Sequence, residues 1–165
     1  MTFGTVFNDH SNLLHTILEG LADEELNVVV TVGRNQDPAR FAGLARNIRI
    51  ERYIPQSLLL PHCDAVISHA GYGTVMGSLV HGLPSVLVPI TADQPMHARR
   101  CAEIGSAISL DRDSLTAEHV RDATQSVLRD SSYRKRAQLL ANEIAELPDS
   151  AAAVALIERI VGNHA

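Results

Sequence analysis

Apolar positions follow two alternating spacings along the chain. Short runs rich in β-branched residues each predict a buried strand, and they fall at residues 27–32, 47–53, 64–68, 85–88 and 107–110. Between most of these runs the apolar residues recur with the period of an amphipathic helix, at residues 12–21, 56–62, 74–81, 94–104 and 116–128. This alternation predicts an α/β fold, a Rossmann-like doubly wound parallel sheet that binds ligands at the carboxyl ends of its strands.

The two ends of the chain depart from this alternation. Residues 1–3 leave room for only a stub of a strand before Gly4, where a doubly wound half would open with a full strand. From Ser131 onward the pattern is helical, and Pro148 separates a stretch at 133–147 from one at 150–160. We expect this tail to close the domain or to pack on a neighbour.

Composition narrows the function classes. The chain has 165 residues, 45% of them hydrophobic, which suffices for the core of one domain. A net charge of -5 argues against a nucleic-acid or anionic-membrane surface as the main partner. The sequence has no apolar run of membrane-spanning length and no signal-peptide pattern, and Cys63 and Cys101 lack metal-ligand spacing. We therefore expect one cytoplasmic domain over residues 1–165, with no metal site.

One segment carries the clearest chemistry, the six residues from His69 to Thr74 with the sequence HAGYGT. It joins a predicted strand to a predicted helix, where Gly71 and Gly73 allow a tight turn and the helix start presents unpaired N–H groups to an anion. The segment is neither a dinucleotide fingerprint, because Met76 stands at the third glycine position, nor a Walker loop. It predicts a diphosphate-binding loop; the alternative is that the glycines serve only close packing.

Five short motifs occur in the order known from one enzyme family. Together they resemble the donor-binding half of the GT-B nucleotide-sugar glycosyltransferases, above all the bacterial enzymes that glycosylate antibiotics; the motifs are TFGTV at 2–6, YIPQ at 53–56, HAGYGT at 69–74, HGLP at 81–84 and ADQP at 92–95. The resemblance covers essentially the whole chain. Since these enzymes also have an N-terminal half, it implies that residues 1–165 are a single nucleotide-sugar donor-binding domain without the acceptor-binding domain.

The resemblance assigns the first motif to the phosphates and the interdomain cleft, and the second motif to the nucleoside. Gly4 and Thr5 match the loop that approaches the phosphates, although an ordinary turn would use the same residues. Tyr53 and Ile54 match the segment that frames the nucleobase, by an aromatic platform and a backbone contact. Gln56 matches a nucleoside contact. The alternatives are that Tyr53 is strand core and that Gln56 is simply the first turn of a helix.

The phosphate loop and the last motif are assigned to the diphosphate and the sugar. His69, Gly71, Gly73 and Thr74 match the residues that hold the pyrophosphate, and the resemblance implies that the side chains of His69 and Thr74 stabilise the leaving group.

Asp93 and Gln94 match the pair that contacts the sugar hydroxyls. A carboxylate only accepts hydrogen bonds whereas an amide also donates, so the pair suits vicinal hydroxyls. Asp93 as a mere helix N-cap is the alternative. The sequence assigns no role to His97 or Arg99, which follow on the same helix.

One position departs from the wider family. Members that use ribonucleotide donors often carry a glutamate three residues after the threonine of the phosphate loop, where it contacts both ribose hydroxyls. This chain has Gly77 there. The absent carboxylate favours a donor without a 2′-hydroxyl, and we therefore expect thymidine diphosphate (dTDP) sugars rather than uridine diphosphate (UDP) sugars.

These expectations combine into one functional hypothesis. The chain is the donor-binding domain of an inverting glycosyltransferase of the hexosyltransferase type, which moves a deoxysugar from dTDP to a small hydrophobic natural product. The family's general base lies in the N-terminal half, so we expect no catalytic base here and nucleotide binding without appreciable turnover. No metal or cofactor is expected. The alternatives are a natural subunit that needs a partner chain and a non-catalytic nucleotide-sugar-binding domain.

Overall fold

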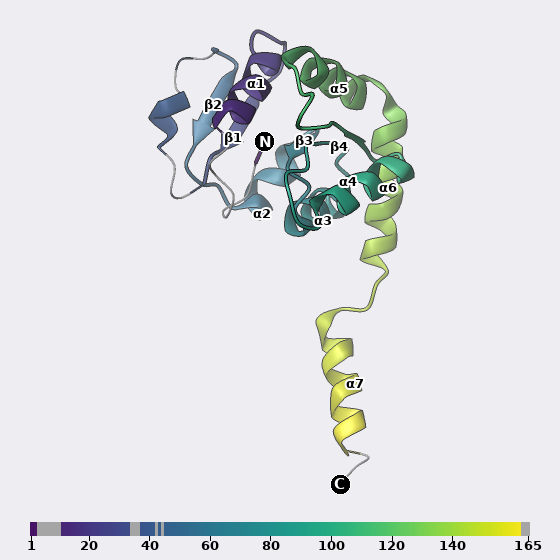
Figure 1. Cartoon of the computed structure of the whole chain (residues 1–165). Helices are drawn as coiled ribbons and strands as arrows, with labels where there is room; N and C mark the ends of the chain where they lie inside the picture. Colours follow the sequence, from purple (N-terminus) through teal and green to yellow (C-terminus); the bar gives the residue numbers. More distant parts are fainter. Residues whose placement is uncertain (3–10, 34–36, 42, 44, 163–165) are drawn as a thin grey trace.

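The computed structural model describes residues 1–2, 11–33, 37–41, 43 and 45–162, and shows an α/β body from which the last helix projects (Figure 1). The described strands are β1 (Val28–Thr31), β2 (Ile48–Glu51), β3 (Val66–Ser68), β4 (Ser85–Leu87) and β5 (Ala107–Ser109). β1 pairs with β2, β4 lies between β3 and β5, and all of these pairs are parallel. The predicted α/β parallel fold is therefore confirmed.

The first two residues of the chain join the two groups of strands. Thr2 forms parallel bridges with Thr31 of β1 and with Ser68 of β3. Its N–H donates to the carbonyl of Ile67 at 3.0 Å, and the N–H of Thr31 donates to the carbonyl of Met1 at 3.0 Å. The strand order is therefore β2, β1, residues 1–2, β3, β4, β5, and the order reverses at the predicted stub. In such sheets, ligands bind outside the carboxyl ends of the strands at this reversal.

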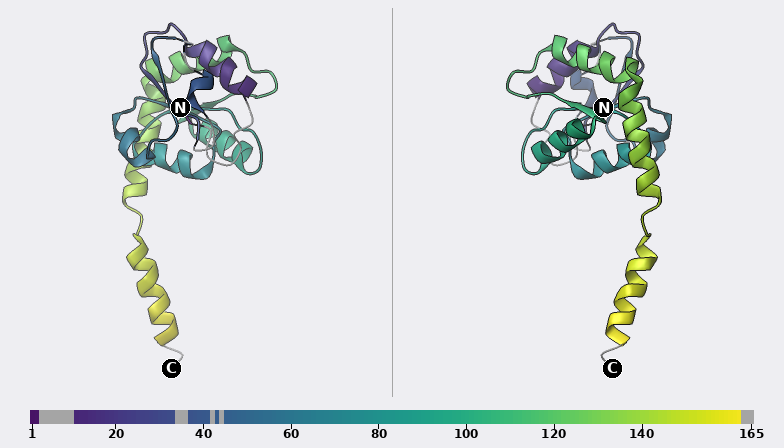
Figure 2. Two further views of the ribbon diagram at one scale, coloured as in Figure 1. Left: turned by 90° about the vertical axis from the view of Figure 1, so that its left-hand side faces the viewer. Right: turned by 90° about the vertical axis from the view of Figure 1, so that its right-hand side faces the viewer.

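Helices cover both faces of the sheet (Figures 1 and 2). Successive strand residues point to opposite faces. Val86 of β4 belongs to one apolar cluster with residues of α1 (Ser11–Leu21) and α5 (Ala117–Arg129). Its neighbour Leu87 belongs to another, with residues of α3 (Tyr72–Val80) and α4 (Gln94–Ile104). The core thus forms an apolar layer on each side of β4, and these layers hold the loops at the strand ends in place.

The structure differs from the predicted elements at several boundaries. The predicted helix 56–62 divides into α2 (Gln56–Leu59) and a 3-10 turn, η2 (Leu60–His62), because Pro61 has no N–H for a helical hydrogen bond. A further 3-10 turn, η1 (Pro38–Phe41), was not predicted. The helix predicted from residue 74 begins two residues earlier, at Tyr72. Each strand is shorter than its apolar run.

Two helices form the C-terminal part of the chain. α6 (Ser131–Ala145) packs against α3, and its N-cap carboxylate, that of Asp130, accepts from the N–H of Ser132 at 2.8 Å. α7 (Ser150–Gly162) extends away from the body (Figure 2) and leaves apolar side chains in solvent, those of Val154, Leu156, Ile157, Ile160 and Val161. No helix in the described part of the chain is both long enough and apolar enough to cross a membrane.

Candidate functional site

The predicted phosphate loop lies between β3 and α3, at the carboxyl edge of the sheet. α3 begins directly after the loop, with Gly71 as its N-cap residue, and no side chain of the described residues caps this end. The N–H groups of Thr74 and Val75 donate to the carbonyl of Gly71, at 3.0 Å each. The first N–H groups of a helix have no partner within it, and the helix dipole makes them attractive to an anion. The loop therefore presents an N-terminus suited to phosphate.

Two alanines near this edge adopt a left-handed backbone conformation. Ala70 has φ 63° and Ala92 has φ 56°, a region that costs a residue with a Cβ roughly 1–2 kcal/mol. Ala70 is fully buried, and its N–H donates to the hydroxyl of Ser68 at 3.3 Å. One alanine follows β3 and the other follows β4, so both loops at the candidate site are held in a strained shape by their surroundings.

The two glycines of the phosphate loop have different surroundings. A Cβ built on Gly71 would lie 2.5 Å from Nε2 of His69, so this residue must be glycine for the imidazole to pack against it. A Cβ built on Gly73 meets no heavy atom of the described residues within 4 Å. The packing alternative therefore accounts for Gly71, whereas the open space at Gly73 is what close approach of a phosphate to the backbone requires.

His69 is buried, at 9% exposure, beside the start of α3. Burial lowers the pKa of its imidazole, and the backbone of Thr2 and the carboxylate of Asp93 oppose this shift. The ring is therefore neutral at pH 7. Its contribution to an anion would come from a neutral N–H donor rather than from a full positive charge.

The side chains of Gln56 and Thr74 meet between α2 and α3. Nε2 of Gln56 donates to Oγ1 of Thr74 at 3.1 Å, and the Thr74 side chain is buried. A hydroxyl that accepts one hydrogen bond still has its own proton to donate. A Cβ on Gly77 would lie 3.6 Å from Oε1 of Gln56, so Gly77 faces the same corner. Gln56, which the sequence predicts to contact the nucleoside, is therefore hydrogen-bonded to a residue of the phosphate loop.

The other residues predicted from the first two motifs lie on the β2–α2 connection or outside the described residues. β2 ends at Glu51, and Tyr53 is 48% exposed, so the alternative that Tyr53 is strand core is wrong. Ile54 is half-buried and lies two residues before Gln56. Gly4 and Thr5 lie outside the described residues.

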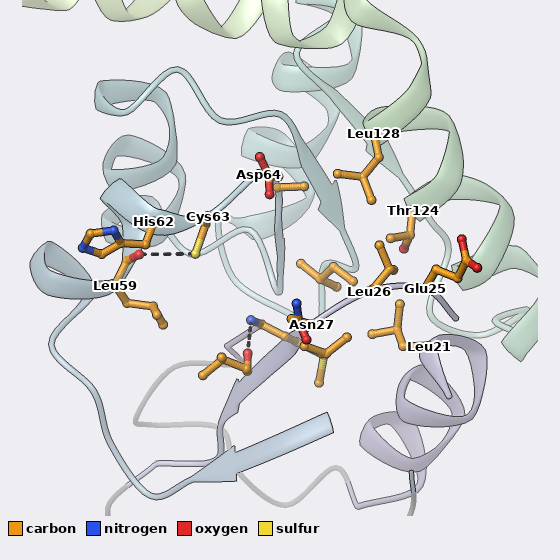
Figure 3. Close-up of a pocket in the computed structure, with 15 residues that line it drawn as sticks. Leu21, Glu25, Leu26, Asn27, Leu59, His62, Cys63, Asp64, Thr124 and Leu128 are labelled. Atoms are coloured by element: carbon orange, nitrogen blue, oxygen red, sulfur yellow. Dashed lines mark hydrogen bonds between the residues drawn. The ribbon is translucent and has the colours of Figure 1, made fainter. Parts of the chain in front are cut away.

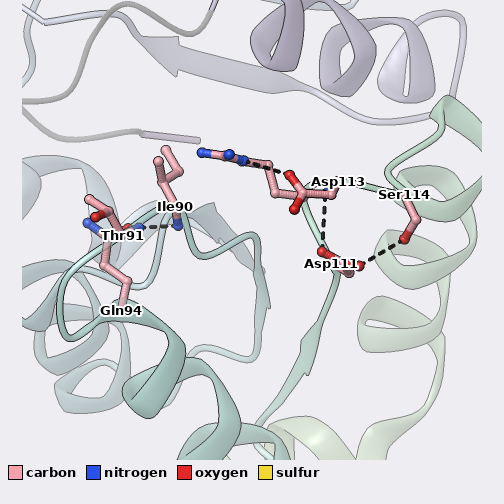
Figure 4. Close-up of polar contacts among 7 residues, drawn as sticks. Ile90, Thr91, Gln94, Asp111, Asp113 and Ser114 are labelled. Atoms are coloured by element: carbon pink, nitrogen blue, oxygen red, sulfur yellow. Dashed lines mark hydrogen bonds and ion pairs between the residues drawn. The ribbon is translucent and has the colours of Figure 1, made fainter.

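In the β4–α4 loop the side chain of Gln94 is buried, whereas that of Asp93 is exposed. Oε1 of Gln94 accepts from the N–H groups of Ile90 at 2.8 Å and Thr91 at 3.0 Å, and the side chain is 4% exposed (Figure 4). Gln94 therefore holds its own loop, and its amide NH₂ is the part left for a ligand. The Asp93 side chain is exposed and makes no capping bond among the described residues, although Asp93 occupies the N-cap position.

Sequence reasoning gave His97 no role, yet the structure places it at this site. Its Nδ1 lies 3.2 Å from the carbonyl of Ala70, and its Nε2 lies 3.9 Å from Oδ2 of Asp93. The four-residue spacing between Asp93 and His97 on one helix face was the available signal. The β5–α5 loop was also missed; there Asp111 accepts from the N–H of Asp113 and the hydroxyl of Ser114 (Figure 4).

A cavity of about 500 Å³ lies elsewhere, at the amino ends of the strands (Figure 3). It is lined largely by apolar side chains, among them Leu21, Leu26, Leu59 and Leu128, with Cys63 and Asp64 at its polar side. None of the predicted donor-binding residues lines it. Within the described residues no group of three or more His, Cys, Asp or Glu side chains is arranged to hold a metal ion.

The parallel sheet, with its reversed strand order, defines a Rossmann-like domain of the GT-B type. Its family follows from comparison with known proteins. The chain belongs to the family described as "Erythromycin biosynthesis protein CIII-like, C-terminal domain", whose model matches residues 15–160. It is thus the C-terminal domain of a GT-B glycosyltransferase.

Individual relatives agree with this assignment. The chain is 36% identical to 4'-demethylrebeccamycin synthase of Lentzea aerocolonigenes, over 98% of this chain and 38% of that protein. It is 33% identical to tylactone mycaminosyltransferase of Streptomyces fradiae, over 91% of this chain and 33% of that protein. The chain thus spans between a third and two fifths of the length of these curated relatives.

Solved structures of glycosyltransferases share the fold. The calicheamicin glycosyltransferase CalG4 superposes with a TM-score of 0.90 at 28% identity, over 99% of this chain and 43% of that one. The glycosyltransferase VinC, solved in complex with dTDP, superposes with a TM-score of 0.85 at 27% identity, over 98% of this chain and 41% of that one.

Proposed function

We propose that this chain binds the nucleoside diphosphate sugar donor of an inverting glycosyltransferase, and that a dTDP-deoxysugar is that donor. The observation that carries the proposal is the open space at Gly73, at the uncapped start of α3 beside the strained Ala70. A diphosphate there would accept hydrogen bonds from the backbone of α3 and from the hydroxyl of Thr74. The dTDP bound by the structural relative VinC supports the same ligand class.

The chemistry required of this chain is stabilisation of a leaving group. As the bond from the sugar to the diphosphate breaks, negative charge grows on the phosphate oxygens. N–H groups and a hydroxyl that are already in place lower the barrier because they need no reorganisation during the reaction. The buried, neutral His69 adds a donor beside them. In this proposal the helix start and these side chains do the work, and no metal ion is required.

The sugar would lie on the β4–α4 side of the diphosphate. The exposed carboxylate of Asp93 accepts from sugar hydroxyls, and the amide NH₂ of Gln94 donates to them. The base that deprotonates a small hydrophobic acceptor would lie in a preceding domain or in a partner chain. We therefore expect this chain to bind its donor without appreciable transfer.

Isothermal titration calorimetry with dTDP, UDP and NAD tests the donor site. We expect dTDP to bind, NAD not to bind, and Gly73→Val to weaken dTDP binding about 100-fold in a chain that stays folded, since the new side chain enters open space. His69→Ala should weaken dTDP binding. A folded chain that ignores dTDP at millimolar concentration would contradict the proposal.

The choice of dTDP over UDP rests on Gly77, which faces Gln56 from α3. A glutamate at this position would place a carboxylate beside the nucleoside corner. We therefore expect Gly77→Glu to raise the affinity for UDP relative to dTDP, with Gly77→Gln as the uncharged control. Equal ratios in the wild type and both variants would contradict the inference from Gly77.

A further inference from the structure

His97 lies between the two loops of the candidate site. It stands in the first turns of α4, and only 18% of its side chain is exposed. Its ring faces the phosphate loop twice, through the carbonyl of Ala70 at 3.2 Å and through the ring of Tyr72, whose centroid is 5.8 Å away. On its other side, Nε2 lies 3.9 Å from a carboxylate oxygen of Asp93. One imidazole therefore touches both loops.

The chemistry of these two neighbours determines which ring nitrogen must carry a hydrogen for each contact to be attractive. A backbone carbonyl only accepts hydrogen bonds, so the contact with Ala70 requires a hydrogen on Nδ1 of His97. The second nitrogen, Nε2, lies 3.9 Å from Oδ2 of Asp93, and because a carboxylate only accepts hydrogen bonds, an attractive contact there requires a hydrogen on Nε2 as well. The ring in this orientation joins the peptide of a left-handed alanine to an exposed carboxylate.

Both loops need such a link. The left-handed conformation of Ala70 persists only if its surroundings hold it. Among the described residues, its N–H donates to the hydroxyl of Ser68 and its carbonyl accepts from Nδ1 of His97. Asp93 has an exposed side chain with no capping bond in the described part of the chain, and Nε2 of His97, 3.9 Å away, becomes its ion-pair partner when the ring is protonated.

We propose that His97 is a positioning residue that sets the distance between the phosphate loop and the carboxylate of Asp93. The diphosphate and the sugar of one donor are then held in fixed relation. This role rests on the donor-binding function proposed above. It predicts that substitutions of His97 change the affinity for the free nucleotide and the affinity for the complete donor to different extents.

The amide variant His97→Asn separates the two contacts of the ring. The amide nitrogen of asparagine falls close to the position of Nδ1, and that of glutamine close to Nε2. His97→Asn therefore keeps the bond to Ala70 and loses the link to Asp93. His97→Ala loses both, and Arg99→Ala is the matched control because Arg99 points into solvent and pairs with Glu103.

The probes are dTDP, which reports on the nucleoside and diphosphate contacts, and dTDP-glucose, which also reports on the sugar contacts. We expect His97→Ala to weaken dTDP binding about 3- to 10-fold, the effect of one hydrogen bond. His97→Asn should restore dTDP binding to within about twofold of the wild type while the additional affinity from glucose stays lost. Arg99→Ala should bind both probes as the wild type does.

The outcomes that overturn the proposal are distinct. A wild-type chain that binds neither probe overturns the donor-binding function, and this role with it. A wild type that binds both, together with a His97→Ala variant of unchanged affinities or a His97→Asn variant no better than His97→Ala for dTDP, overturns the positioning role alone. Nitrogen-15 spectra of the histidine rings add a test without ligand: a neutral His97 with its hydrogen on Nε2 would contradict the contact with Ala70.

Discussion

The two edges of the sheet have opposite characters. At the amino edge lies the cavity of about 500 Å³, surrounded mainly by leucines and other apolar side chains (Figure 3). At the carboxyl edge lie two strained alanines, two helix starts and a group of buried polar residues: Ser68, His69, Thr74 and Gln94. Ser85, Ser106 and Thr124 are also buried, so the carboxyl edge is distinguished by the strained alanines beside its buried polar groups rather than by polar burial alone.

This contrast shows that the volume of a cavity does not by itself identify a binding site for a charged ligand. The amino-edge cavity has volume and a largely apolar lining, with single polar side chains such as Glu25, Asn27 and Thr124 around it. The carboxyl edge has a prearranged backbone, which is what binding of a charged diphosphate demands. Substitutions at the amino edge should therefore change folding stability, and substitutions at the carboxyl edge should change nucleotide binding.

The largest effect is expected at the amino edge, from Leu21→Ala. Leu21 is 1% exposed, belongs to the core on the α1 and α5 side and also lines the cavity. Its truncation should lower the free energy of unfolding by about 2–5 kcal/mol, because it removes buried methyl groups and enlarges a void. Urea denaturation measures this loss, and calorimetry should show unchanged dTDP affinity at a temperature where the variant is folded.

The exposed Leu58 provides the control for this comparison. It is 68% exposed, so Leu58→Ala should change stability by no more than about 0.5 kcal/mol. If the folded Leu21→Ala chain lost dTDP affinity, the two edges would not be independent and the contrast would fail.

The next effect is expected at the carboxyl edge, from Gly73→Val. A side chain there occupies the open space at the start of α3 without meeting protein atoms. It should reduce dTDP affinity about 100-fold, the loss of one or two hydrogen bonds to a charged group, with the free energy of unfolding within about 1 kcal/mol of the wild type.

Gly71→Ala is the informative partner of this variant. Its Cβ would collide with the imidazole of His69, so the main result should be lower stability. Gly73→Val with wild-type affinity would show that the space at Gly73 is not the phosphate position.

A smaller effect is expected from the hydrogen bond between Gln56 and Thr74. Thr74→Val removes the hydroxyl that would donate to a phosphate, and should weaken dTDP about 10- to 20-fold, near the lower end for one hydrogen bond to a charged acceptor. Gln56→Ala should cost less. Since the two residues touch, their effects on dTDP affinity should not add in the double variant. Strict additivity by calorimetry would mean that the pair acts separately.

The order of helices and strands could be predicted from the sequence, because it depends on the local spacing of apolar residues. The apolar runs located every described strand of the sheet, and the HAGYGT segment falls at the end of β3, as the periodicity indicates. Pro61 explains the main helix error, since its effect on the 56–62 stretch is also local and was readable in the sequence.

The features of the candidate site that could not be predicted from the sequence depend on contacts between distant segments. Gly71 and Gly73 are equivalent in the motif and differ only through the position of the His69 ring. Gln94 reads as a ligand contact but turns its carbonyl oxygen to the backbone of its own loop. His97 gains meaning only when the β3–α3 loop lies beside α4. Such differences arise from packing, which single-sequence patterns do not encode.

The smallest effect is expected from the protonation of His69. Burial lowers the pKa of this ring, whereas the unfolded chain titrates near the usual histidine value of about 6.5. Below that value the unfolded state binds more protons than the folded state, so stability must fall as pH falls through this range. The Met1 amino group, with its pKa lowered by burial to about 6, adds a loss of the same sign between pH 8 and 6.

The variant His69→Gln separates these two contributions, because it keeps the Met1 amine and removes the imidazole. We expect the loss of unfolding free energy between pH 7.5 and 5.5, measured with urea, to be smaller in His69→Gln than in the wild type. The exposed His119 is the control, and His119→Gln should keep the wild-type pH dependence. If His69→Gln lost as much stability as the wild type, burial would not lower the pKa of the His69 ring, and the inference that the carboxyl edge holds a neutral donor would be wrong.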